Sequence, residues 1–202
     1  MVLYSLRTLA CVPGLDAIVL VVASDQLNHA KDLLAQGGPW SVPIELCAGG
    51  AARQDSVAAG LMRVDAAAEF VIVHDAARPF VSLACVQACL DAAAVSGAAI
   101  AAMPARDTIK LVGANGAVEQ TLNREAIWLA QTPQVFRTAL LRQAYELVSR
   151  DADVATDDAA LVERLGGTVR VVPGEWANQK ITTPQDLEWA EWYVRSQSSA
   201  AE

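Results

Sequence analysis

Residues 70–80 read FVIVHDAARPF, and this stretch decides the fold that we expect. Its first four residues form a short apolar run, which in a chain of alternating strand and helix patterns is typical of a strand buried on both faces. We therefore expect residues 70–73 to form a central strand of a parallel sheet. Asp75 and Arg78 follow at its carboxyl end, where open α/β sheets bind ligands. The pattern alone leaves open a plainer interpretation, in which Asp75 and Arg78 are a local ion pair that caps the strand.

Strand and helix patterns alternate on both sides of this stretch. We expect strands at residues 16–23, 42–47, 98–103, 127–130, 169–173 and 179–181. We expect helices at residues 2–9, 24–37, 57–64, 82–96 and 136–150, with two more that begin near Thr156 and Pro184. Residues 131–134 are expected to extend from the end of a strand toward the site. The repeated strand, helix, strand order implies right-handed parallel crossovers and a three-layer α/β sandwich.

One segment differs from this alternation. Residues 108–112 and 118–121 are β-prone and flank the sequence GANGA, in which Asn-Gly indicates a hairpin turn. The hairpin has too few apolar residues for a core of its own, and isolated hairpins are marginally stable. We expect it to pack against something else.

Composition limits the classes of protein that the chain can belong to. A chain of 202 residues with 53% hydrophobic content can bury one substantial core, so we expect a single domain over residues 1–202. The net charge of −8 argues against a general nucleic-acid or anionic membrane surface. No apolar stretch is long enough for a membrane span and no signal-peptide pattern follows Met1, so we expect a cytoplasmic location. The four cysteines form no CxxC pair and are interpreted as core thiols.

The heptapeptide HDAARPF at residues 74–80 resembles the signature of the 2-C-methyl-D-erythritol 4-phosphate cytidylyltransferase family of the non-mevalonate isoprenoid pathway. Similar blocks follow the family's order at residues 49–57, 106–110, 123–124, 131–134, 156–157 and 178–182. The resemblance implies a Rossmann-like sandwich of the nucleotidyltransferase type with a protruding β-hairpin arm at residues 105–124. In the family this arm is exchanged between the two subunits of a homodimer, which would carry Thr108 and Arg124 into the partner's active site.

The segment GGAARQDS at residues 49–56 leads into a helix. Glycines permit a close backbone approach to a ligand and a helix amino terminus favours anions, although the same pattern also fits an ordinary strand-to-helix turn. The resemblance implies that this segment holds the cytosine and ribose of CTP through Gly50, Ala51 and Ser56. It places Asp75 and Ala76 on the CTP side as well.

The reaction that the resemblance implies is attack by the phosphate of methylerythritol phosphate on the α-phosphorus of CTP, which gives 4-diphosphocytidyl-2-C-methylerythritol and pyrophosphate. A phosphate monoester has a second pKa of about 6, so the nucleophile is mostly anionic at neutral pH and needs no general base. His29 and His74 are the only histidines, and no Ser/His/Asp or Cys/His constellation is convincing. Because two polyanions must meet in line, the site should supply cations and positioning.

Four residues are expected to neutralise charge in the site and to bind the substrate phosphate. We interpret Lys180 and Arg78 as the catalytic cations, which also contact the substrate, while a plain surface lysine remains the alternative for Lys180. The resemblance implies that Arg124 and Thr108 of the partner subunit bind the substrate phosphate.

The remaining substrate contacts are polar and uncharged except for one carboxylate. Thr132 and Thr156 are expected to add hydroxyl contacts. Asp75 either binds the erythritol hydroxyls or helps to organise Mg²⁺, and the resemblance favours the hydroxyls. We expect Mg²⁺ or another divalent cation to be held mainly by the CTP phosphates, with no protein ligand assigned.

The chain departs from the family at its start. Met1-Val2-Leu3-Tyr4 resembles the helix that follows the family's first strand and glycine-rich CTP loop. We therefore expect the chain to lack that loop, to bind CTP poorly and to turn over little.

Two other functions remain open. Ribitol-5-phosphate cytidylyltransferases share the fold and chemistry, but usually carry a bulkier residue at the position of Ala77 and lack Lys110, which favours methylerythritol phosphate here. The second alternative is a catalytically impaired homologue that has kept the fold and the dimer.

Overall fold

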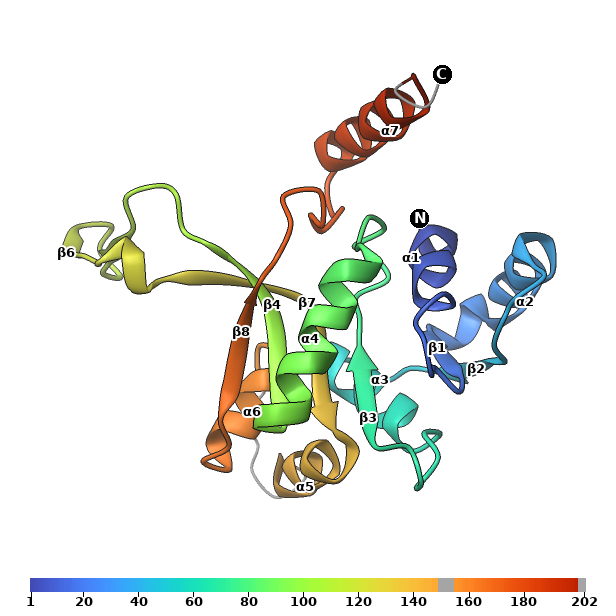
Figure 1. Cartoon of the computed structure of the whole chain (residues 1–202). Coiled ribbons are helices and arrows are strands. Elements are labelled where there is room, and N and C mark those ends of the chain that lie inside the picture. Colours follow the sequence, from blue (N-terminus) through green and yellow to red (C-terminus); the bar gives the residue numbers. More distant parts are fainter. Residues whose placement is uncertain (149–154, 200–202) are drawn as a thin grey trace.

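The structure is a computed structural model that describes residues 1–148 and 155–199 (Figure 1). Its helices are α1 (Val2–Leu9), α2 (Leu27–Gly37), α3 (Arg53–Leu61), α4 (Leu83–Ser96), α5 (Thr138–Val148), α6 (Asp158–Arg164) and α7 (Pro184–Ser199), with short 3₁₀ turns η1 (Ser24–Gln26) and η2 (Arg124–Ala126). Its strands are β1 (Ile18–Val22), β2 (Ile44–Ala48), β3 (Phe70–Val73), β4 (Ala98–Pro104), β5 (Lys110–Val112), β6 (Val118–Thr121), β7 (Trp128–Arg137) and β8 (Val169–Pro173).

The strands form three hydrogen-bonded groups. The largest is a four-stranded sheet in the order β3-β7-β4-β8. In it β8 runs parallel to β4, whereas β7 runs antiparallel to both β3 and β4. The pair β1 and β2 is parallel, and β5 and β6 form the expected hairpin. The α/β class is confirmed, but the main sheet is mixed.

The expected placement of residues 70–73 is wrong. The segment is a strand, but β3 lies at the end of its sheet and pairs antiparallel with β7, as in the register Val71 with Phe136. All four residues of β3 are partly exposed. A short apolar run predicts a strand, but it does not identify a hydrogen-bonding neighbour that lies more than sixty residues away.

The strand β7 is longer than expected because residues 131–134 do not leave the sheet. The apolar pair Val135 and Phe136 is fully buried and continues the strand to Arg137. The register with β4 shifts between Ile100 and Ala102, opposite the segment that contains Pro133. A proline has no N–H to give to a ladder, so a local irregularity there is expected. Phe136 therefore belongs to β7, and the expected helix begins at Thr138.

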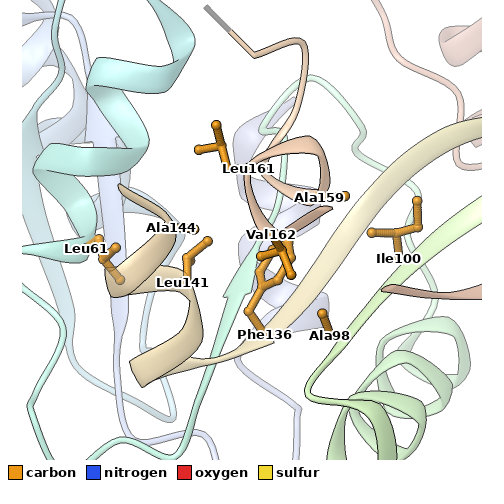
Figure 2. Close-up of a cluster of buried hydrophobic side chains, with 9 residues drawn as sticks. All are labelled: Leu61, Ala98, Ile100, Phe136, Leu141, Ala144, Ala159, Leu161 and Val162. Carbon is orange, nitrogen blue, oxygen red and sulfur yellow. The ribbon is translucent and has the colours of Figure 1, made fainter. Parts of the chain in front are cut away.

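Helices cover the two faces of the main sheet (Figure 1). Alternate residues of β4 point to opposite faces, so Ala98 and Ile100 pack with α5 and α6, whereas Ala99 and Ala101 pack with α4. Figure 2 shows the first of these clusters, in which Phe136 of β7 lies next to Val162 of α6. The three-layer arrangement that the sequence predicts is confirmed for this part of the chain.

Helix ends follow local chemistry. The Ser82 hydroxyl accepts a hydrogen bond from Cys85 N and caps α4, and Gly97 ends the helix with a φ of 88°, both as expected. The cap of α6 is Asp157, which accepts from Ala160 N, and the expectation that Thr156 would be the cap is wrong. Residues 149–150, part of the helix expected at 136–150, lie outside the described residues.

Three smaller expectations are corrected. Residues 179–181 are irregular, and Ile181 N donates to Ala77 O in a single backbone bond instead of a ladder. Ser24 lies in η1, so α2 begins three residues later than expected. Cys11 is exposed, whereas the other three cysteines are buried.

The hairpin of β5 and β6 projects from the body of the protein (Figure 1). Its apolar residues Leu111, Val112 and Val118 are 47–59% exposed. In the described part of the chain, no helix is both long and apolar enough to cross a membrane.

Candidate active site

A cleft of about 220 Å³ lies beyond the carboxyl end of β3. The residues that line it come from α3, the loop after β3, β7, the segment before α6 and the loop before α7: Arg53, Asp75, Arg78, Ala130, Gln131, Thr132, Gln134, Thr156, Asp157 and Lys180. Five of the residues predicted for the site therefore meet here, namely Asp75, Arg78, Thr132, Thr156 and Lys180.

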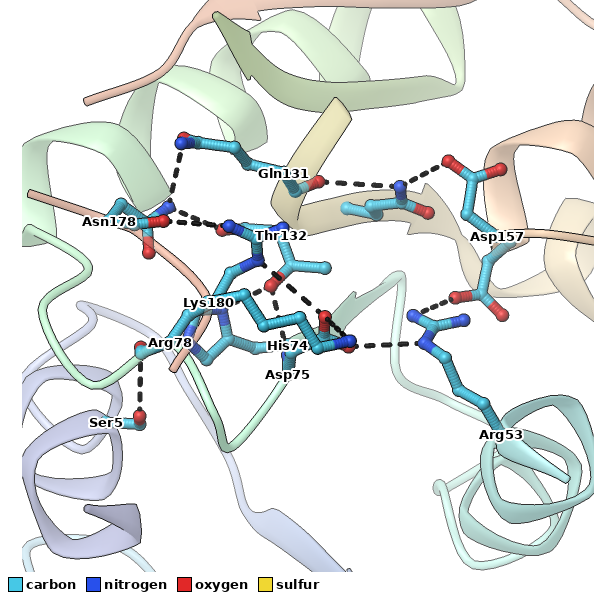
Figure 3. A network of polar contacts seen from close by, with 12 residues as sticks. Ser5, Arg53, His74, Asp75, Arg78, Gln131, Thr132, Asp157, Asn178 and Lys180 are labelled. Atoms are coloured by element: carbon cyan, nitrogen blue, oxygen red, sulfur yellow. Dashed lines mark hydrogen bonds and ion pairs between the residues drawn. The ribbon is translucent and has the colours of Figure 1, made fainter. Parts of the chain in front are cut away.

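Asp75 is the centre of the cleft's charges (Figure 3). Its Oδ2 lies 3.0 Å from Lys180 Nζ and 3.7 Å from Arg78 Nε, and its Oδ1 lies 3.2 Å from Arg53 Nε. Burial alone would raise the pKa of Asp75, but hydrogen bonds and charges from Lys180 and Arg53 lower it below the ordinary value. Asp75 is therefore an anion that holds cationic side chains around it.

Arg78 is fixed by the backbone around it. Its Nη1 donates to Asn178 O at 2.8 Å, and its own carbonyl accepts from the Ser5 hydroxyl of α1 at 3.2 Å. Phe80, two residues later, contacts Tyr4 and two aromatic rings of α7. The loop after β3 is thus held between the first and last helices.

Lys180 is positioned by a buried amide nearby. Asn178 is fully buried, and its Nδ2 donates to Thr132 O at 2.7 Å and to Gln131 Oε1 at 3.3 Å. These bonds fasten the loop before α7 to β7. The Lys180 side chain itself is 42% exposed, so its ammonium can turn from Asp75 toward a ligand in the cleft.

A chain of hydrogen bonds fixes the hydroxyl of Thr132. Asp75 N donates to Thr132 Oγ1, and Thr132 Oγ1 and His74 Nδ1 lie 3.0 Å apart. His74 Nε2 lies 3.0 Å from Arg78 O, a carbonyl that can only accept, so Nε2 carries the proton and a neutral ring accepts at Nδ1. The Thr132 hydroxyl proton is therefore used within the protein, and Thr132 can offer a ligand only an acceptor.

The histidine gives a testable dependence of stability on pH. Burial lowers the pKa of His74 from its ordinary 6.5, so the folded protein favours the neutral ring. The unfolded chain binds the proton more readily, so the free energy of unfolding should be highest above about pH 6.5 and fall as pH drops toward 5. Denaturant titrations from pH 8 to 5 should show this fall. It should shrink in His74→Gln and persist in His29→Gln, which changes an exposed residue of α2; an equal fall in His74→Gln would contradict the assignment.

The predicted CTP residues Gly50, Ala51 and Ser56 lie at the start of α3, outside the residues that line the cleft. Gly50 N donates to Ser56 Oγ at 3.2 Å, and the Ser56 hydroxyl donates to Ala52 O. A Cβ at Gly50 would overlap the Cβ of Asp55, so the turn needs a glycine there. Ala76 lines a separate, mainly apolar cavity of about 300 Å³ beside β1, α1 and α2.

The arm residues Thr108 and Arg124 are also outside the cleft of their own chain. Both are exposed, and Arg124 Nη1 donates to Arg106 O at 2.8 Å. Their predicted contact with substrate therefore depends on a second copy of the chain.

From the sequence, no site role was predicted for four polar residues that line the cleft. They are Arg53, Gln131, Gln134 and Asp157. All lie within the matched blocks, which was the available signal. Gln134 Nε2 donates to Asp157 Oδ2 at 2.8 Å, and its Oε1 accepts from Ala159 N, so this amide ties β7 to the start of α6.

Comparison with known proteins identifies the family. The family model described as 2-C-methyl-D-erythritol 4-phosphate cytidylyltransferase matches residues 1–196. A protein of that name from Syntrophus aciditrophicus is 44% identical over 194 residues, which cover 96% of this chain and 83% of the relative. A crystal structure of 4-diphosphocytidyl-2C-methyl-D-erythritol synthase from Anaerococcus prevotii matches with a TM-score of 0.89 at 32% identity, over 96% of this chain and 88% of that one. The enzyme of Thermus thermophilus gives a TM-score of 0.79 at 37% identity, over 96% and 89%. The chain therefore belongs to the 2-C-methyl-D-erythritol 4-phosphate cytidylyltransferase family.

Proposed function

We propose that the protein transfers the cytidylyl group of CTP to 2-C-methyl-D-erythritol 4-phosphate and releases pyrophosphate, in the synthesis of isoprenoid precursors. Membership of the family supports the reaction class. The observation that carries the proposal in this chain is the cluster of Arg53, Arg78 and Lys180 around Asp75 in one cleft. Such a cluster suits a reaction between polyanions.

The transfer forms one bond and breaks one. A phosphate oxygen of the acceptor attacks the α-phosphorus of CTP, and the bond from that phosphorus to the bridging oxygen of the β-phosphate breaks. The electron pair leaves with pyrophosphate. The nucleophile is already an anion, so no proton has to be removed from it, and His74, whose two ring nitrogens are occupied within the protein, is not needed as a base.

In this proposal Lys180 and Arg78 offset the negative charge that accumulates between the two substrates. The two cations differ in freedom, because Arg78 is 12% exposed and anchored to Asn178, whereas Lys180 is 42% exposed. Arg78 would therefore provide a fixed charge, and Lys180 would move from Asp75 onto a phosphate oxygen when substrate arrives.

Asp75 and the two threonines would orient the acceptor. A carboxylate has about four acceptor positions, so Asp75 can take an acceptor hydroxyl while it keeps its cationic partners. Thr132 would accept a hydrogen bond from a substrate hydroxyl, because its own proton goes to His74. Thr156, which precedes α6, also lines the cleft.

The proposal includes a divalent cation. Among the described residues no three His, Cys, Asp or Glu side chains converge as a metal cage. Asp75 is held by cationic side chains, and both oxygens of Asp157 accept hydrogen bonds, from Ala160 N and Gln134 Nε2. This donor set fits Mg²⁺ bound through CTP phosphate oxygens rather than a protein cage, and the ion would there neutralise phosphate charge.

We also propose that the arm completes the site in a homodimer. Thr108 and Arg124 are exposed and flank the hairpin of β5 and β6, which projects from the body of the chain and exposes Leu111, Val112 and Val118. An exposed hairpin of this kind is stabilised if a second copy covers it.

Three expectations stay predictions. They are a single domain over residues 1–202, the arm boundaries 105–124 and the cytoplasmic location.

The choice of acceptor is tested by pyrophosphate release in the presence of CTP and Mg²⁺. Assays use the 202-residue chain and an extended chain, in which a relative's amino-terminal glycine-rich segment precedes Met1. We expect methylerythritol phosphate to give a kcat/KM at least about 100-fold above ribitol 5-phosphate in the form that turns over, since a site built for one acceptor leaves polar groups unpaired with another. A preference for ribitol 5-phosphate would establish the alternative, and release with neither acceptor in either form would contradict the proposal.

A further inference from the structure

Arg53 joins the carboxylate at the centre of the cleft to a second, buried carboxylate. It is the first residue of α3. Its Nε lies 3.2 Å from Asp75 Oδ1, and its Nη2 lies 2.8 Å from Oδ2 of Asp158, the first residue of α6. The Asp158 side chain is 1% exposed, whereas that of Arg53 is 32% exposed. One guanidinium thus connects Asp75, in the loop after β3, with Asp158 at the start of α6.

Asp158 is held from its other side. The Tyr145 hydroxyl of α5 donates to Asp158 Oδ1 at 2.5 Å. Burial raises the pKa of Tyr145, and the charge of Asp158 raises it further, so the phenol stays protonated and keeps donating at neutral pH. Among the described residues, the polar contact of Asp158 Oδ2 is the ion pair with Arg53. The position of Asp158 therefore determines where the Arg53 guanidinium lies.

This arrangement divides the two oxygens of Asp75 between different partners. Arg53 takes Oδ1, which leaves Oδ2 facing Lys180 at 3.0 Å and Arg78 at 3.7 Å. A carboxylate rotates easily about its last bond, and Arg53, through its planar fork, restrains that rotation. The cation pair that we assign to the chemistry is thus aligned by a residue on the opposite wall.

We propose that Arg53 is a positioning residue of the transfer reaction, which orients Asp75 and is itself oriented by Asp158 and Tyr145. This inference rests on the proposed function for its effect on rate, but not for its effect on Asp75. The competing explanation is that Arg53 only neutralises the buried charge of Asp158, since a buried carboxylate without a partner is strongly destabilising.

A pair of variants separates the two roles. Arg53→Gln leaves the charge of Asp158 buried without a cationic partner, so the melting temperature of this variant should fall. Arg53→Gln combined with Asp158→Asn removes both charges and should recover most of the lost melting temperature. If Arg53 positions Asp75, the double variant should remain defective in the cleft although its stability returns. Arg63→Gln is the matched control, because it removes another arginine–carboxylate pair, with Glu45 at 2.8 Å on the surface.

The deciding readout is the titration of Asp75, followed by ¹³C NMR of its carboxyl carbon. Hydrogen bonding and charge from Arg53 help to lower the pKa of Asp75, so this pKa should rise in both Arg53 variants and stay unchanged in Arg63→Gln. In the extended chain, kcat should fall about 10- to 100-fold in the double variant, the scale of a small misplacement in a site. A double variant with normal stability, normal Asp75 titration and normal kcat would overturn the proposal.

The proposed function can fail separately. If no form of the protein turns over any acceptor, the function is wrong, while the NMR titration and the melting temperatures still test Arg53. A normal Asp75 titration in the double variant would then overturn the positioning role by itself.

Discussion

Replacing Lys180 with alanine should lower kcat by about 10²- to 10³-fold, or about 3–4 kcal/mol in activation free energy, which is the scale of losing one preorganised transition-state contact. The reason is electrostatic, because the ammonium would offset the additional negative charge that develops while the acceptor phosphate and pyrophosphate share the α-phosphorus. Lys180→Arg should recover only part of the rate, since a planar fork does not replace a compact charge aimed at one oxygen. Steady-state kinetics on the extended chain measure both variants.

Stability should hardly change in Lys180→Ala. The side chain is 42% exposed, and exposed ion pairs contribute about 0–1 kcal/mol. Lys31→Ala is the matched control, because Lys31 is an exposed lysine on α2. If Lys180→Ala kept a near-normal kcat, Lys180 would be a surface charge and Arg78 the principal cation.

Two variants that are each nearly inactive should regain activity when they are mixed. Arg124→Ala should raise the KM for methylerythritol phosphate, because a contact with the substrate phosphate is lost, and Lys180→Ala should lower kcat. If Arg124 acts in the partner's site, a mixed dimer contains one site with both natural residues. Random pairing should then restore about a quarter of the wild-type activity, measured at a substrate concentration well below the raised KM.

The mixing experiment has a physical control. Deleting residues 111–120, the end of the arm, should give a monomer with an intact sheet by sedimentation and circular dichroism, and no recovery on mixing. The outcome against exchange would be additive residual activities after mixing, or a wild-type monomer at tens of micromolar. Arg124 would then act within its own chain or not at all.

The sequence predicted which residues meet in the cleft better than it predicted the sheet that brings them together. Asp75 and Arg78 were placed correctly at a strand end because a strand's own residues define where it stops. The prediction that this strand lies at the centre of a parallel sheet was wrong. Its hydrogen-bonding neighbour is β7, which reaches β3 only after the chain has passed through the arm. Pairing across such a distance depends on packing of Val135 and Phe136, which no local pattern shows.

The role of Arg53 was missed for a similar reason. An arginine at a helix start is ordinarily a solvated residue. Arg53 belongs to a matched block, but the resemblance implied no contact between Arg53 and a buried carboxylate. Its buried partner, Asp158, lies where the sequence predicts only the start of a helix, near Thr156. Only the folded arrangement shows that this carboxylate is 1% exposed and opposite the Arg53 guanidinium. The burial of Asp158 is what makes its ion pair with Arg53 specific.

The central claim is that an anionic acceptor phosphate attacks the α-phosphorus of CTP in this cleft. The most direct measurement uses methylerythritol phosphate labelled with ¹⁸O in its phosphate, with the products followed by ³¹P NMR and mass spectrometry. The account predicts that all of the label stays in the cytidine diphosphate product, including the new bridging oxygen, and that the released pyrophosphate carries none. Label in pyrophosphate, or CTP consumed to CMP without the labelled diphosphate, would contradict it.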